Sequence, residues 1–121
     1  MNVSKPHTNS EPLAEIFSLL GQPARLHILL AIGAGQACVC HLEAVLGLRQ
    51  ASISQQLMLL RKAGLVESER VGRHIFYHLT DKRWIELIQA AAEITGIALP
   101  HFDLPEIQGC EYIPAEKSSS K

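Results

Sequence analysis

The feature that most constrains the fold of this sequence is a change in its hydrophobic period near residue 65. Up to Ala63 the apolar residues recur at helical spacing, whereas residues 74–79 alternate with a period of two. A period of two places successive side chains on opposite faces of a strand. Residues 65–69 supply a partner strand, and residues 70–73 contain the glycine of a turn. The chain is therefore predicted to be mainly α, with one β-hairpin.

Turn residues divide the helical part into four predicted helices. Apolar spacing favours helices over residues 11–20 and 23–32, separated by Gly21-Gln22-Pro23. A short helix over 38–46 ends at Gly47, and a longer one over 50–63 ends at Gly64. A fifth helix is predicted to start at Asp81, after the hairpin.

A chain of 121 residues fits a single domain. We expect this domain to cover residues 11–96, with a flexible arm over 1–10 and an irregular tail over 97–121 that carries Cys110. No apolar run approaches the roughly 18 residues that a membrane span needs, and the first ten residues lack an apolar signal-peptide centre. These observations predict a cytoplasmic protein with no membrane partner, in which the three cysteines are free thiols rather than disulfides.

The charge of the chain is distributed unevenly, although its net value is only −1. Residues 49–83 contain seven lysines and arginines against three acidic residues, while residues 84–121 contain two lysines against six acidic residues. A positive segment inside a nearly neutral chain is the electrostatic footprint of a nucleic-acid contact. The positive segment coincides with the predicted helix 50–63 and the hairpin.

The element order, ααααββα, is that of a winged helix-turn-helix protein. In such a fold the second helix of the pair lies in the major groove of DNA. With Ile53, Leu57 and Leu60 buried, the polar side chains of the helix 50–63 would face the bases, and glutamine and serine both bond to base edges. Arginines at the helix ends and in the turn suit phosphates. The predicted DNA contacts are Arg49, Gln50, Ser52, Ser54, Gln55, Gln56, Arg61, Arg70 and Arg73.

One reading helix contacts only a few base pairs, so useful affinity requires two half-sites related by a two-fold axis. The apolar residues of the last helix, between Trp84 and Ala92, occupy more than one side of it. Such a wide apolar band predicts packing on a partner as well as on the helix's own core. A homodimer through the first and last helices is therefore expected.

Two cysteines lie at the start of the predicted helix 38–46, in the sequence Cys38-Val39-Cys40. On a regular helix their side chains would diverge by about 200°. They converge if Cys38 precedes the helix and Cys40 opens it, and a helix N-terminus also favours the metal-binding thiolate. The neighbouring His41 is a possible fourth ligand, but we predict that it faces solvent.

From about Leu13 to Ala92 the sequence resembles the ArsR/SmtB family of metal-sensing repressors. The motifs that carry the resemblance are Gln22-Pro23-x-Arg25, Cys38-Val39-Cys40-x-Leu42, Leu60-Arg61-x-Ala63-Gly64-Leu65-Val66 and Gly72-Arg73-x3-Tyr77-x-Leu79. The resemblance implies that the Cys-x-Cys pair binds an inducer such as arsenite, antimonite, cadmium or lead, and that binding releases operator DNA.

The sequence departs from the family's pattern in its ligands. Glu43 replaces the third cysteine of the similar arsenic sensors, and residues 1–10 contain no cysteine. Arg83 and Ile94 stand where the zinc-type site has histidines, so that site is predicted to be absent. We therefore hypothesise that Cys110 folds back, within its own subunit or across the dimer, to complete a three-sulfur site with Cys38 and Cys40.

Three functions remain to be weighed. The preferred one is a repressor released by As(III) or Sb(III), with Cd or Pb as alternative ions and no organic cofactor. The second is a repressor that senses oxidants or persulfides through Cys38 or Cys40 and Cys110. An enzyme is not expected, because no glycine-rich anion loop or oxyanion motif accompanies the cysteines.

Overall fold

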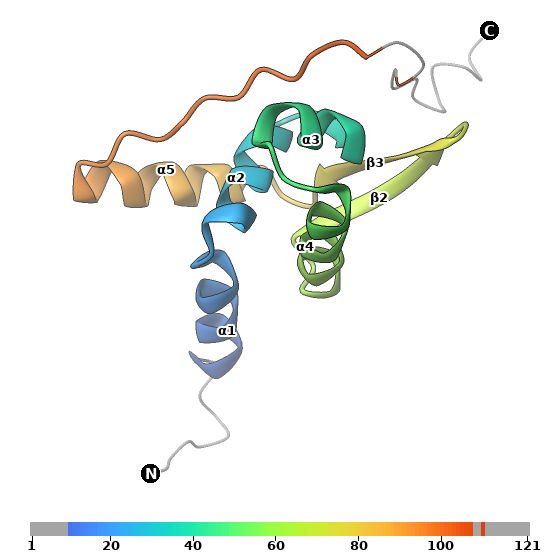
Figure 1. Cartoon of the computed structure of the whole chain (residues 1–121). Coiled ribbons are helices and arrows are strands. Elements are labelled where there is room, and N and C mark those ends of the chain that lie inside the picture. The colour runs from blue at the N-terminus through green and yellow to red at the C-terminus, as the bar shows by residue number, and fades with distance from the viewer. Residues whose placement is uncertain (1–9, 108–109, 111–121) are drawn as a thin grey trace, which may run out of the picture.

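The computed structural model describes residues 10–107 and residue 110 (Figure 1). The helices and strands, in chain order, are α1 (Ser10–Leu20), α2 (Pro23–Ile32), β1 (Gln36–Cys38), α3 (Val39–Leu46), α4 (Gln50–Lys62), β2 (Val66–Val71), β3 (His74–Leu79) and α5 (Arg83–Thr95). The predicted winged helix-turn-helix is confirmed: α3 and α4 form the helix pair, and β2 and β3 form the wing. Of the arm predicted over 1–10, residues 1–9 lie outside the described residues, and Ser10 is the first residue of α1. Residues 108, 109 and 111–121 of the predicted tail also lie outside them.

The sheet has a third strand, β1, that the sequence did not predict. The strand order is β1-β3-β2, and both pairs are antiparallel. Residues 36–38 are too few to establish a period of two, and their extended conformation is fixed by pairing with β3. Cys38 lies opposite Phe76 in this register, so the start of α3 is attached directly to the wing.

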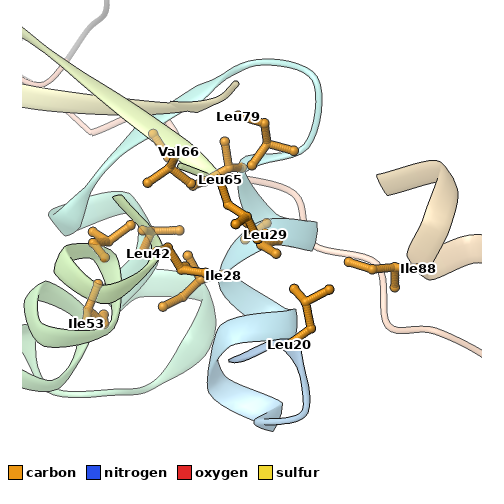
Figure 2. Close-up of a cluster of buried hydrophobic side chains, with 14 residues drawn as sticks. Leu20, Ile28, Leu29, Leu42, Ile53, Leu65, Val66, Leu79 and Ile88 are labelled. Carbon is orange, nitrogen blue, oxygen red and sulfur yellow. The ribbon is translucent and has the colours of Figure 1, made fainter. Parts of the chain in front are cut away.

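The core lies around α2, which contacts α1, α3, α4, α5 and the sheet. Ile28 and Leu29 of this helix are fully buried (Figure 2). Ile53, Leu57 and Leu60 of α4 are also fully buried, as their spacing predicted. The helix α4 is thus held by one apolar stripe, which leaves its opposite face for other contacts.

The helix α5 begins at Arg83, two residues later than predicted. Asp81 does not belong to the helix, because its side chain bonds to the first helical residue. The backbone N–H of Arg83 donates to the Asp81 carboxylate at 2.9 Å, and the Arg83 guanidinium bonds to the same group. Hydrogen bonds from the side chain and then the backbone of Arg83 lower the pKa of Asp81 to about 2. The Asp81 carboxylate therefore holds the first residue of α5 in place.

The tail after α5 contains neither helix nor strand over residues 97–107, but it packs on the domain. Leu99, Phe102 and Leu104 lie against the core, and the ring of Phe102 is 5.5 Å from that of His27 in α2. The tail runs back from the end of α5 past α2 and α3 toward the wing (Figure 1). This path brings Cys110 to the wing side of the domain, against Phe76. Among the described residues, no helix has the length and apolar character of a membrane span.

The buried stripe of α4 gives a stability prediction. Replacing Leu57 by Ala should lower the free energy of unfolding by about 2–5 kcal/mol, because the side chain is fully buried and its loss leaves a cavity. The adjacent Met58 is 55% exposed, so Met58→Ala should change stability by less than about 0.5 kcal/mol. Urea denaturation followed by circular dichroism measures both values. Equal losses in the two variants would contradict the packing described.

Candidate metal centre and nucleic-acid interface

The three cysteines form one cluster at the junction of β1, α3 and the tail. The sulfur of Cys38 contacts those of both Cys40 and Cys110, and the sulfurs of Cys40 and Cys110 are 2.7 Å apart. One sulfur atom forms only one disulfide, so these mutual contacts describe three sulfurs around a common point. Cys38 and Cys110 are almost completely buried. The Cys110 that meets the pair belongs to the same subunit.

Local backbone structure explains why the Cys38 and Cys40 side chains converge. Cys38 is extended at the end of β1 and caps α3, while Cys40 lies in the first turn of that helix. This is the arrangement that the Cys-x-Cys spacing required. The sulfur of Cys38 also accepts the backbone N–H of His41. This hydrogen bond and the positive end of the helix dipole both favour negative charge on the sulfur.

His41 is buried beside the sulfurs, so the prediction that it faces solvent was wrong. Its side chain is 8% exposed. Its Nδ1 accepts the backbone N–H of Cys38 at 3.2 Å and lies 3.3 Å from the Cys38 sulfur. Burial, and secondarily the charge of His74, lower the pKa of His41, so the ring is neutral near pH 7. Its ligand atom and the three sulfurs all lie within 4.8 Å of one another.

The side chains around the cluster come from the wing and the tail. Phe76 of β3 is buried against Cys38 and Cys110, with Val71 of β2 and Ile107 of the tail at the edge. The His41 and Phe76 rings are 6.1 Å apart. The cluster therefore has an apolar wall on the wing side, which excludes water and strengthens charge interactions inside it.

The face of α4 opposite its buried stripe is polar and exposed. Gln50, Ser54, Gln55 and Arg61 are exposed on α4 outside this stripe, and Arg49 precedes the helix in an exposed position. Ser52 is half-buried at the flank. The exposed Met58 also lies on this face, where its thioether suits the methyl group of thymine. Met58 was not among the predicted contacts, although its position one turn after Ser54 indicated the same face.

Gln56 is also on α4, but it is held by another helix. The Nε of Arg25 in α2 donates to the Gln56 Oε1 at 2.7 Å, and the Arg25 Nη1 donates to the carbonyl of Leu19 at 3.1 Å. Both side chains are half-buried. The prediction of Gln56 as a DNA contact did not foresee this bond. Arg25 thus links the end of α1 to α4, and it fixes the amide plane of Gln56.

The wing carries Arg70 and Arg73 on either side of Gly72, and both arginines are exposed. Gly72 has a φ of +64°, a left-handed conformation that favours glycine in this tight turn. The strands β2 and β3 form a two-stranded ribbon (Figure 1), and the two exposed cations lie in its turn and beside it.

Apolar side chains remain exposed on α1 and α5. Leu13 and Phe17 of α1 are 54% and 51% exposed, and Ile94 of α5 is 84% exposed. An apolar hollow of about 360 Å³ lies between these helices and the start of the tail, with Phe17, Leu87 and Ile97 in its wall. In a single protomer this surface would remain in contact with water, which is unusual for so many large apolar side chains.

The helix pair, the wing and the exposed polar face of α4 define a DNA-binding transcriptional regulator of the winged helix-turn-helix class. A family model for bacterial regulatory proteins of the arsR family matches residues 22–68. The chain belongs to this family, which the sequence motifs had indicated.

Similar proteins include a transcriptional repressor SmtB homolog from Synechocystis, which is 36% identical over 84 residues. That match spans 69% of this chain and 64% of the relative's length. The crystal structure of NolR from Sinorhizobium fredii has a TM-score of 0.69 and 31% identity, and it covers 81% of this chain and all of NolR. The transcriptional repressor BigR from Xylella fastidiosa has a TM-score of 0.64 and 34% identity, covering 70% of this chain and 87% of its own.

The Arg25–Gln56 bond gives a prediction about DNA binding. Arg25→Ala should weaken operator binding about fivefold, because a hydrogen bond worth about 1 kcal/mol no longer orients the Gln56 amide. Fluorescence anisotropy on a duplex selected from a random pool measures the affinity. If Arg25 acts through Gln56, the double variant Arg25→Ala/Gln56→Ala binds no more weakly than Gln56→Ala alone. Additive losses would contradict this coupling.

Proposed function

We propose that this chain is a homodimeric repressor that binds operator DNA through α4 and the wing, and that As(III) or Sb(III) releases it. The proposed ligands are Cys38, Cys40 and Cys110. The observation that carries the proposal is the meeting of three sulfurs from β1, α3 and a tail residue 70 positions away. Thiolates select soft ions.

The chemistry of arsenite matches three thiols. Arsenous acid, As(OH)₃, exchanges its three hydroxyl groups for three sulfurs, and each exchange consumes one thiol proton and releases one water. The product has three As–S bonds in a pyramid and no net charge. An uncharged centre suits a site whose walls include Phe76 and Ile107, because burying an uncompensated charge there would be costly.

The position of the site offers a route from the ion to DNA. Cys40 belongs to α3, whose buried Leu42 packs in the same core as Ile53 of α4. Cys38 pairs with Phe76 in the wing. Bonding of all three sulfurs to one ion would fix Cys38 and Cys40 relative to each other, and a displacement of either residue would reach α4 or the wing, the two proposed DNA-contacting elements. A coupling free energy of about 1–3 kcal/mol is typical, and a useful repressor needs the upper end of that range.

The DNA contacts that we propose are Arg49, Gln50, Ser52, Ser54, Gln55, Gln56, Arg61, Arg70 and Arg73. Their support is the exposure of the α4 face and of the wing tip, together with the excess of positive charge over residues 49–83. The glutamines and serines would contact base edges, and the arginines would contact phosphates or the minor groove.

The inducer proposal predicts the behaviour of cysteine variants. Arsenite should lower operator affinity of the reduced wild-type protein by tenfold or more, as measured by fluorescence anisotropy. Cys38→Ser, Cys40→Ser and Cys110→Ser should each bind DNA normally but lose most of the response, because a serine hydroxyl is a poor ligand for a soft ion. Normal arsenite release in Cys110→Ser would contradict the three-sulfur site. Release by cadmium or lead but not by arsenite would favour those ions instead.

A second candidate function rests on the 2.7 Å distance between the sulfurs of Cys40 and Cys110. Two thiols at this distance can lose two protons and two electrons to a peroxide or persulfide and form a disulfide. Such a repressor would respond to the oxidant, and dithiothreitol would reverse the response. Under reducing conditions it would show no sulfur-to-metal absorbance and no release by arsenite, which separates the two functions.

The apolar surface of α1 and α5 gives a prediction about assembly. Phe17→Glu and Ile94→Glu should each convert a dimer into a monomer, because a carboxylate would be buried in the apolar interface. Operator affinity should fall by a hundredfold or more, since one half-site remains. Analytical ultracentrifugation measures the mass. The control is Ile75→Glu, on the exposed side of the wing, which should leave the dimer intact.

A further inference from the structure

The ring nitrogen of His41 that faces the sulfur cluster, Nδ1, already accepts a hydrogen bond. Nδ1 accepts the backbone N–H of Cys38 at 3.2 Å. A neutral imidazole nitrogen that accepts a hydrogen bond has its single lone pair directed at the donor, so the ring proton is on Nε2. The bond forms one half of a reciprocal cap, whose other half is the His41 N–H donating to the Cys38 sulfur.

The same nitrogen is the obvious fourth ligand for an ion at the sulfurs. Within the described part of the chain, the group of candidate ligands here consists of the three cysteines and His41. To coordinate an ion, Nδ1 would have to release the Cys38 N–H. That N–H belongs to a residue that is 3% exposed, so water would not replace the lost acceptor. An unsatisfied buried N–H weakens ion binding roughly ten- to a hundredfold.

We propose that His41 is a specificity-determining residue, which restricts the site to three sulfur ligands by keeping Nδ1 engaged at the start of α3. This inference rests on the proposed metal site. A three-sulfur site suits As(III) and Sb(III), whose lone pair occupies the fourth direction. Zinc in closed protein sites is almost always tetrahedral. It would have to take water or disrupt the cap, and both alternatives cost affinity.

The reciprocal cap provides a matched pair of variants. Glutamine or glutamate at the third helical position is the usual partner in such a cap. His41→Gln therefore retains an acceptor for the Cys38 N–H but removes the imidazole. His41→Ala removes both the acceptor and the imidazole. The two variants separate the capping role of His41 from a role as ligand.

The experiment combines ion titration with local measurements on the full, reduced chain. Arsenite and zinc affinities are measured by absorbance and by competition with a chromophoric chelator. X-ray absorption at the zinc edge reports imidazole bound to zinc. We expect His41→Gln to keep both affinities within about threefold of wild type, and zinc in the wild type to show sulfur and oxygen neighbours without imidazole. Exchange of the Cys38 amide hydrogen should be tenfold or more faster in His41→Ala than in His41→Gln.

Other results would overturn the proposed role of His41. Imidazole bound to zinc in the wild type, or a tenfold loss of zinc affinity in His41→Gln, would show that His41 is a ligand and would overturn the inference. If His41→Ala does not fold, rapid exchange of the Cys38 amide in the wild type would overturn it in the same way. If arsenite does not bind the wild type, the proposed function fails, whereas the zinc spectra and amide exchange still decide the role of His41.

Discussion

The arrangement of this protein depends on the backbone of Cys38. Pairing with Phe76 fixes one side of the residue in the sheet, and the N–H and sulfur of Cys38 both bond to His41 across the start of α3. Because both neighbours constrain it, the Cys38 sulfur has little freedom to turn away from Cys40. The helix pair, the wing and the sulfur cluster therefore share one residue, and a displacement at the sulfurs has to be absorbed by α3 or by β3.

The third sulfur reaches this point through ordinary apolar packing. Leu99, Phe102 and Leu104 hold the tail along the core, although residues 97–107 form no helix or strand. Each apolar contact offsets part of the entropy of ordering the chain, so the tail needs no regular structure to place Cys110. In the proposed function, a site assembled in this way would couple ion binding to the order of the tail, because the three sulfurs must be brought together before three bonds can form.

Local periodicity made the main elements predictable. The stripe of Ile53, Leu57 and Leu60 identified the buried side of α4, and the alternation over 74–79 identified the wing strand. Sequence reasoning failed where a residue's environment comes from a distant segment. The strand β1 exists because β3 pairs with it, His41 is buried because Phe76 and Cys38 surround it, and Gln56 is held by a residue of α2.

The sequence by itself determined the order of helices and wing, the polar face of α4, and the requirement that Cys38 precede its helix for the two sulfurs to converge. These properties follow from spacing along the chain, which fixes the direction of each side chain within a regular element. Only the tertiary structure placed Cys110 beside the pair and showed that the Nδ1 lone pair of His41 is engaged. Those outcomes depend on packing between segments distant in sequence, which no local period records.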